Sequence, residues 1–264
     1  MRLVEEDFSV LRGPLESGRQ SPSNISFVLI ISIFLQSLLY GVLSYLTKGE
    51  TLFPNHEKIL SVHLWLTIIL SVFSIIYSIP AVYRKSSRIQ YLLSILVTHN
   101  MSTFPFLLLS LFLLGSTYGG AITSTKSLLM VTYVILSLGL FILISTFIRF
   151  YILLKKGQYR KGSKKDEQRS KLESMSFLPG AIAGGVGVVF VIQYLAKNSA
   201  FDDSNFAILI VGGILTFFVM MFILPEQLVI LYCKYRYKSF NFNERGYLYS
   251  SEDQKVKRKR GIEA

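Results

Sequence analysis

The sequence predicts an all-α membrane protein with six transmembrane helices, cytoplasmic N- and C-termini and no extramembrane domain. Of its 264 residues, 51% are hydrophobic and only 17% are charged, whereas a soluble domain carries about 25% charged residues. The apolar residues also gather in runs of about twenty, the length that crosses ~30 Å of hydrocarbon as a helix. This pattern excludes a soluble globule, a disordered chain and a secreted disulfide scaffold.

The predicted spans form one transmembrane domain over residues 25–233. Each span must be helical, because lipid offers no hydrogen-bond partner to the backbone. The spans are predicted at residues 25–46, 61–83, 91–115, 128–150, 178–196 and 206–233. Residues 1–24 have apolar side chains near helical spacing, which indicates a short helix on the inner leaflet or a flexible tail. Residues 234–264 form a polybasic tail, and no segment outside the spans is long enough for a packed domain.

The distribution of Lys and Arg tests this topology. With six spans, 24 of the 28 Lys and Arg residues fall on one side of the membrane. The other side carries Lys48, Lys58, Lys126 and Lys197. Because cytoplasmic loops retain Lys and Arg, both termini are placed in the cytoplasm, and a missed span would destroy the asymmetry. The same rule accounts for the net charge of +12, so we expect no nucleic-acid partner.

Polar residues inside the predicted spans are the candidate functional residues, because polar groups at lipid depth are costly. They are Gln36, His99, Asn100 and Glu226. His99 and Asn100 lie ~15 Å inside the third span, near the bilayer midplane, and Gln36 lies at a similar depth. Pro105 follows and removes a backbone donor. These groups line an ion or peptide pathway, or they hydrogen-bond across helices and hold the bundle together; both interpretations stay open.

Glu226 lies beside Pro225 in the inner half of the last span. A carboxylate there is expected to be protonated, to pair with Arg149 at the inner end of the fourth span, or to face a cytoplasmic vestibule. An interfacial ion pair is the simplest of these. His63 is placed near the outer boundary, where it should reach headgroups or water. Cys233 is expected to be a packed apolar residue, with a lipidated or reactive thiol as the alternative.

The fifth predicted span is rich in glycine. The residues with small-xxx-small spacing include Gly180, Gly184, Gly185 and Gly187. Small side chains let helix backbones approach closely, so we expect this span to pack inside the monomer, with a homodimer face as the alternative. Gly212 and Gly213 in the last span are a candidate partner surface.

The polybasic tail ends in a dense cationic cluster. Its members are Lys255, Lys257, Arg258, Lys259 and Arg260. Each cationic side chain near an anionic membrane surface contributes ~1 kcal/mol to binding. We therefore expect the tail to contact anionic headgroups of the lipid bilayer, or a protein partner.

Motifs of enzyme chemistry are absent from the sequence. It has no Gly-rich phosphate loop, no His-Glu-x-x-His and no Gly-x-Ser-x-Gly. The single cysteine excludes an intrachain disulfide and a thiolate metal site. We therefore expect no enzymatic function, no cofactor and no metal.

Two functions remain as expectations. The first is a permease-type subunit for transport or export in the cell membrane, expected to be a bacterial plasma membrane, working with a cytoplasmic ATPase or another membrane subunit. Six spans with both ends inside is a layout shared with many small permease subunits of ABC exporters, although no motif here is specific to them. The alternative is a non-transporting immunity or assembly factor, for example one that protects against a membrane-active peptide.

Overall fold

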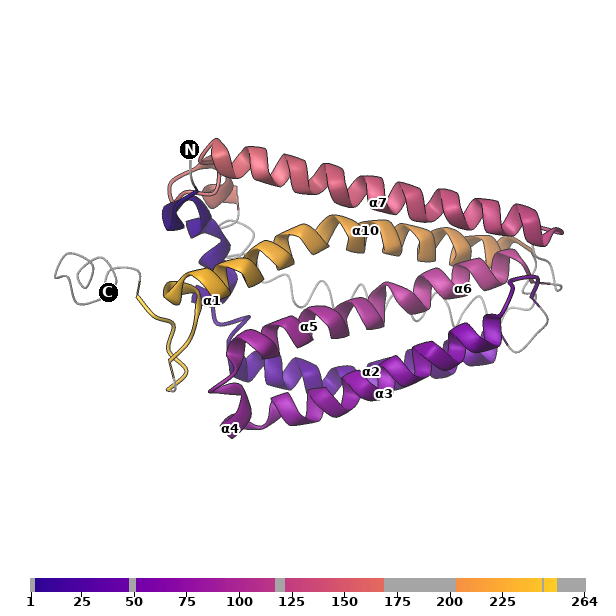
Figure 1. Ribbon diagram of the computed structural model, residues 1–264, viewed down its shortest axis with the longest axis horizontal. Helices are drawn as coiled ribbons and strands as arrows, with labels where there is room; N and C mark the ends of the chain where they lie inside the picture. The colour runs from indigo at the N-terminus through magenta and orange to yellow at the C-terminus, as the bar shows by residue number, and fades with distance from the viewer. Residues whose placement is uncertain (1–2, 48–50, 117–121, 169–202, 244, 251–264) are drawn as a thin grey trace.

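The computed structural model describes residues 3–47, 51–116, 122–168, 203–243 and 245–250. Within these residues the chain is helical, with two isolated β-bridges and no strand. The long helices lie side by side along one axis (Figure 1). Five helical stretches within the described residues are long and apolar enough to cross a membrane. The all-α, multi-span prediction is confirmed to this extent, and the predicted span 178–196 lies outside the described residues.

The helices in chain order are η1 (Glu5–Arg12), α1 (Gly13–Glu16), α2 (Pro22–Leu46), α3 (His56–Ser78), α4 (Pro80–Tyr83), α5 (Ser87–Ser102), α6 (Phe104–Leu114), α7 (Thr125–Lys155), α10 (Asp203–Arg236) and η2 (Lys238–Phe240), where η denotes a 3₁₀ helix. The candidate spans are α2, α3, the combined stretch Ser87–Leu114, α7 and the part Leu209–Arg236 of α10. Each contains most of one predicted span, although the ends differ by several residues.

Local sequence accounts for where the helices begin and end. The Ser21 hydroxyl accepts the backbone N–H of Asn24 at 3.4 Å, and Pro22 occupies the first helical turn, so α2 begins earlier than the predicted residue 25. Helix α3 runs over residues 56–78 rather than 61–83, because the residue before Pro80 is extended and ends the helix. Helix α7 extends beyond the predicted 128–150 at both ends.

The third span is interrupted near its middle. Helix α5 ends at Ser102 and α6 begins at Phe104, with Pro105 in the first turn of α6. Proline has no backbone N–H, so the carbonyl of Met101 lacks its usual donor four residues later. The expected local disruption at Pro105 is therefore present, directly after His99 and Asn100.

Helices α7 and α10 run in the same direction. Gly139 of α7 packs against the ring of Phe217 of α10. Later in both helices, Thr146 and Phe222 line a common pocket, so the residue numbers of the two helices increase in the same direction. Both helices therefore finish at the same end of the bundle, where α1 also lies (Figure 1). We call this the capped end.

The capped end is covered by three short segments, which together we call the cap. They are residues 3–21, residues 156–168, and residues 237–243 with 245–250. The backbone N–H of Val10 donates to the carbonyl of Tyr159 at 2.9 Å, and Arg160 Nη2 lies 2.7 Å from Asp7 Oδ1. Arg12 donates to the carbonyl of Tyr249 at 3.2 Å. The N-terminal segment, expected as a short helix on the leaflet or as a flexible tail, is helical over residues 5–16 and packs on protein.

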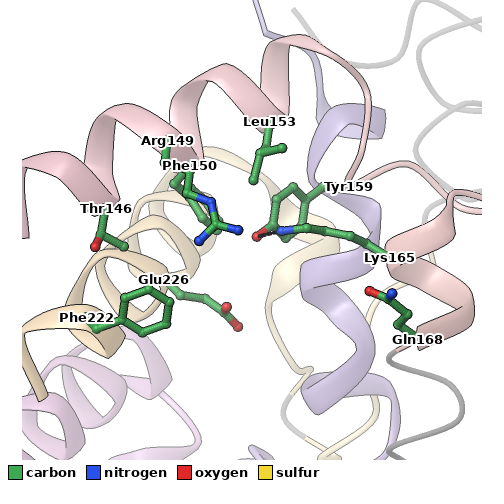
Figure 2. A pocket seen from close by; sticks show the side chains of 9 residues that line it. All are labelled: Thr146, Arg149, Phe150, Leu153, Tyr159, Lys165, Gln168, Phe222 and Glu226. Atoms are coloured by element: carbon green, nitrogen blue, oxygen red, sulfur yellow. Dashed lines mark hydrogen bonds between the residues drawn. The ribbon is translucent and has the colours of Figure 1, made fainter. Parts of the chain in front are cut away.

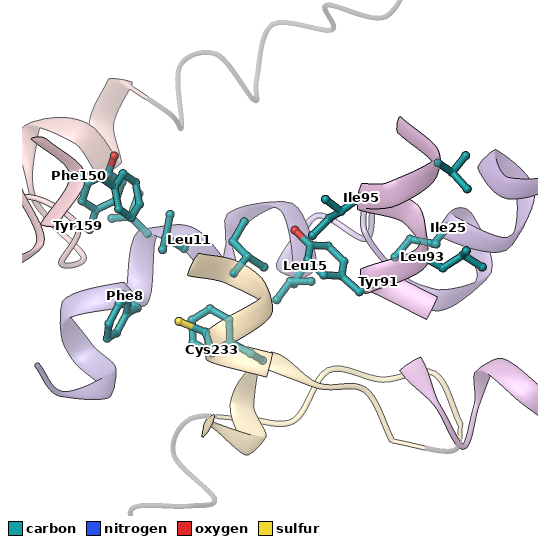
Figure 3. Packing of buried hydrophobic residues seen from close by; sticks show 14 of the residues in the cluster. Phe8, Leu11, Leu15, Ile25, Tyr91, Leu93, Ile95, Phe150, Tyr159 and Cys233 are labelled. Carbon is teal, nitrogen blue, oxygen red and sulfur yellow. The ribbon is translucent and has the colours of Figure 1, made fainter. Parts of the chain in front are cut away.

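The cap continues the apolar core of the bundle. Phe8, Leu11 and Leu15 are at most 2% exposed and belong to one cluster with residues of the long helices. Figure 3 shows this run of side chains from the cap to the bundle, with Cys233 among them. The cap is therefore an extension of the bundle rather than a separate domain, and the packed interpretation of Cys233 agrees with its burial.

Aromatic contacts also join the cap to the end of α10. The rings of Phe8 and Tyr237 lie 5.8 Å apart, and Tyr237 contacts Phe240 at 6.2 Å. Partial burial raises the pKa of the Tyr237 phenol above its ordinary value. This phenol therefore stays neutral at physiological pH.

Candidate functional site

Three polar side chains meet near the middle of the bundle. Asn100 Nδ2 donates to Gln36 Oε1 at 2.7 Å and to Thr67 Oγ1 at 3.0 Å. All three residues are at most 5% exposed. Because they lie on α5, α2 and α3, this Gln36–Thr67–Asn100 network cross-links three helices. Two residues that the sequence placed at the same depth are thus in direct contact.

His99 points to a different helix from its neighbour Asn100. Its Nδ1 lies 3.0 Å from Thr103 Oγ1, and its Nε2 lies 3.1 Å from Oε1 of Gln227 on α10. An amide oxygen only accepts, so this assignment places the proton on Nε2, and Nδ1 accepts from the Thr103 hydroxyl. His99 therefore connects the break between α5 and α6 to α10, two residues beyond Pro225.

Glu226 lies in a third place, a pocket of about 270 Å³ between α7 and α10 at the capped end. The lining residues are Thr146, Arg149, Phe150, Leu153, Tyr159, Lys165, Gln168, Phe222 and Glu226. In Figure 2 the Arg149 guanidinium and the Glu226 carboxylate come from facing helices and point toward the same space. Lys165 Nζ donates to the Tyr159 hydroxyl at 2.8 Å. The ion pair between Glu226 and Arg149 that the sequence favoured is not present among the described residues, although both side chains line this pocket.

The four predicted intramembrane residues therefore do not form one site. Gln36 and Asn100 belong to the central network, His99 to the α5–α6–α10 junction, and Glu226 to the pocket. This separation follows from helix geometry, because consecutive residues on a helix are about 100° apart and face different neighbours.

Sequence reasoning missed several of the partners. Thr67, Thr103 and Gln227 each complete one of these contacts. Thr67 lies midway along its span, at the depth of Gln36, and that match is the signal that was available. Hydroxyl side chains carry little signal on their own, because they often bond to their own helix backbone.

Two further buried polar residues hold the capped end together. Gln90 is fully buried and donates through Nε2 to the carbonyls of Pro22 at 2.9 Å and Tyr77 at 3.0 Å. Lys234 is 1% exposed, and its Nζ lies over the rings of Tyr91 and Phe242. These contacts fix the starts and ends of four helices around the cap.

His63 is where the structure overturns an expectation. The sequence predicts contact with headgroups or water, but His63 is 5% exposed and lies between the rings of Tyr40 at 5.9 Å and Phe104 at 6.3 Å. The reason is the earlier start of α3 at His56, which places His63 two turns inside the helix.

Several predicted residues lie outside the described part of the chain. They are Gly180, Gly184, Gly185 and Gly187 of the fifth predicted span and Lys255, Lys257, Arg258, Lys259 and Arg260 of the tail. The suggested partner surface is described: Gly213 packs against Phe106 and Ser110 of α6, whereas Gly212 borders open space. Gly213 is therefore used within the bundle, and the glycine-mediated homodimer stays a prediction.

The fold and these sites define a helical protein with several membrane-length helices, joined by buried polar contacts and closed at one end by a cap. No protein-family model, curated protein or solved structure matches the chain. Its function must therefore be argued from its own geometry.

Proposed function

We propose that this chain is a permease-type subunit of a cell membrane, with six spans and both termini in the cytoplasm, which moves or exports a substrate together with a cytoplasmic partner. The parallel course of α7 and α10 supports the sixth span. Two consecutive spanning helices that run in the same direction require another crossing between them. The apolar segment 178–196 has the length for that crossing.

The positive charges support a cytoplasmic assignment of the capped end. Arg84 and Lys85 lie in the connection between α4 and α5, and Arg88 lies in the first turn of α5. The loop after α7 carries further Lys and Arg residues. Cytoplasmic loops retain such residues. The cap would then face the cytoplasm, where an ATPase would meet it.

The observation that carries the transport proposal is the junction at His99. Here the break before Pro105 in one span lies next to Pro225 in another, and the imidazole hydrogen-bonds both sides. Interrupted helices at membrane depth are typical of transporters, because the two halves can shift relative to one another. A partner bound to the cap would act on α7 and α10, whose ends are packed against it.

The proposal is tested on the full chain purified with its partners in mild detergent. We expect a nucleotide-hydrolysing subunit in stoichiometric amount, with ATP hydrolysis that falls severalfold when His99→Ala and Glu226→Gln are combined while the complex stays assembled. His56→Ala is the matched histidine control at the opposite end, and it should leave hydrolysis unchanged. Unaltered hydrolysis in the double variant would contradict a role for these residues in transport.

A non-transporting immunity or assembly factor is the second candidate. The Gln36–Thr67–Asn100 network favours it, because the Asn100 side-chain nitrogen donates its two hydrogen bonds to Gln36 and Thr67 rather than to a ligand. Cells with and without the gene would be challenged with a pore-forming peptide. Protection that survives the combined His99→Ala and Glu226→Gln substitutions supports this candidate over the first.

A further inference from the structure

Arg149 is a cation near the end of a membrane-length helix. Its side chain is exposed, and its guanidinium makes no hydrogen bond or ion pair with any residue that the structure describes. It lies six residues before Lys155, the end of α7, which is ~9 Å along the helix. The headgroup layer is ~5–7 Å thick on each side of the hydrocarbon. With Lys155 at the outer edge of this layer, the backbone of Arg149 lies at the border between headgroups and hydrocarbon, and its long side chain can reach the lipid phosphates.

The pocket around Arg149 has an excess of positive charge. Among the described residues that line it, Arg149 and Lys165 are cationic and Glu226 is the one acid. Lys165 is held in place, since its Nζ donates to the Tyr159 hydroxyl and lies 4.2 Å from the centre of that ring. The planar fork of a guanidinium matches two oxygens of a phosphate group. The pocket is thus suited to a group with a single negative charge.

An apolar groove of about 330 Å³ joins this pocket along α7. Its lining residues are Ser145, Ile148, Arg149, Ile152 and Leu153, and it shares Arg149 and Leu153 with the pocket. Ile148 and Ile152 are 56% and 45% exposed. Their spacing of four residues places them on one face, so the groove follows the helix axis.

From this juxtaposition we propose that the end of α7 binds an anionic phospholipid, with the phosphate between Arg149 and Lys165 and an acyl chain against Ile148 and Ile152. A polar, cationic pocket next to an apolar groove at headgroup depth matches the two parts of such a lipid. Glu226 opposes the bound charge and limits the affinity. The site is independent of whether the protein transports a substrate.

The test measures binding of dioleoylphosphatidylglycerol to the full chain in nanodiscs made otherwise of dioleoylphosphatidylcholine. Arg149→Gln should weaken binding by about tenfold or more, because a charge-assisted hydrogen bond is worth about 1.5–3 kcal/mol. Arg149→Lys keeps the charge and should restore part of the affinity. Lys155→Gln is the matched control, because Lys155 is a cation on the same helix but contacts the ring of Tyr151 instead of the pocket. The lipid affinity of this variant should stay close to the wild-type value.

Two further measurements separate the site from its alternatives. Glu226→Gln should tighten lipid binding, because it removes the opposing charge; a purely structural Arg149–Glu226 contact would instead give weaker folding without tighter binding. Millimolar inorganic phosphate should fail to displace the lipid. Displacement by phosphate would show a site for a soluble anion, and wild-type affinity in a folded Arg149→Gln variant would show no lipid site, so either result overturns the proposal.

Discussion

At the scale of single residues, the central network should contribute measurably to stability. Asn100→Leu leaves Gln36 Oε1 and the Thr67 hydroxyl without their shared donor in a buried place. We expect the free energy of unfolding to fall by about 1–2 kcal/mol, the upper range for polar contacts between membrane helices. The measurement is unfolding by a denaturing detergent in mixed micelles, followed by helical circular dichroism.

A double-mutant cycle with Gln36→Leu isolates the contact itself. If the two amides stabilise one another, the loss in the double variant is smaller than the sum of the two single losses. Ser37→Ala is the control, since its hydroxyl is exposed and bonds only the carbonyl of Ile33 on its own helix. Strictly additive losses would mean that the Gln36–Asn100 hydrogen bond contributes nothing.

The sequence predicted the surroundings of some polar residues better than those of others. Gln36 and Asn100 were predictable as a matched pair because depth follows directly from the helical rise. The facing direction of His99 was not, because it depends on which helix lies beside α5, and α10 is more than a hundred residues away in the chain. His63 was placed in the wrong environment because a cap such as Asn55, with its positive φ, gives no hydropathy signal.

At the scale of helices, the contact between α6 and α10 gives the sharpest prediction. A side chain at Gly213 would collide with the backbone oxygen of Phe106 and the hydroxyl of Ser110, whereas nothing lies within 4 Å at Gly212. Gly213→Ala should therefore destabilise the fold by about 1–3 kcal/mol, because α6 must move away. Gly212→Ala, next in sequence, should be neutral or slightly stabilising. Thermal unfolding of the two variants in detergent checks this, and equal midpoints would contradict the close approach.

Helix existence was predictable, but helix ends were not. A long apolar run identifies a span because nothing else satisfies the backbone in lipid. The ends depend on short-range features such as Ser21, Pro80 and Pro105, which lie within or beside apolar sequence and shift a boundary by several residues. Pro105 predicts the break in the third span. It does not predict that the separate helix α6 packs on α10, because the sequence does not show which helix lies beside α6.

At the scale of the whole molecule, the cap could not be predicted from any one segment. Its three parts are far apart in sequence and each is too short to fold alone, and only together do they bury Phe8, Asp7 and Arg12. The Asp7–Arg160 and Val10–Tyr159 contacts join residues about 150 positions apart. Such contacts leave no periodic pattern in the sequence.

The topology can be tested directly, because a helix as long as α7 should place its two ends on opposite sides of the membrane. Helix α7 has 31 residues, or about 46 Å, which crosses a bilayer including its headgroups. Lys126 and Lys164, near its two ends, are both exposed. A membrane-impermeant maleimide applied to intact cells should label Lys126→Cys and leave Lys164→Cys unlabelled until the membrane is permeabilised. The native Cys233 is fully buried and should not interfere.

The parallel course of α7 and α10 extends this test to the C-terminal side. Arg245 is exposed beyond the end of α10, and the cap holds that region beside the loop after α7. Arg245→Cys must therefore behave as Lys164→Cys does, whichever side of the membrane that is. Labelling of the two from opposite sides would contradict the bundle itself. Labelling of both from outside would keep the bundle and invert the proposed orientation, and with it the side on which an ATPase partner could bind.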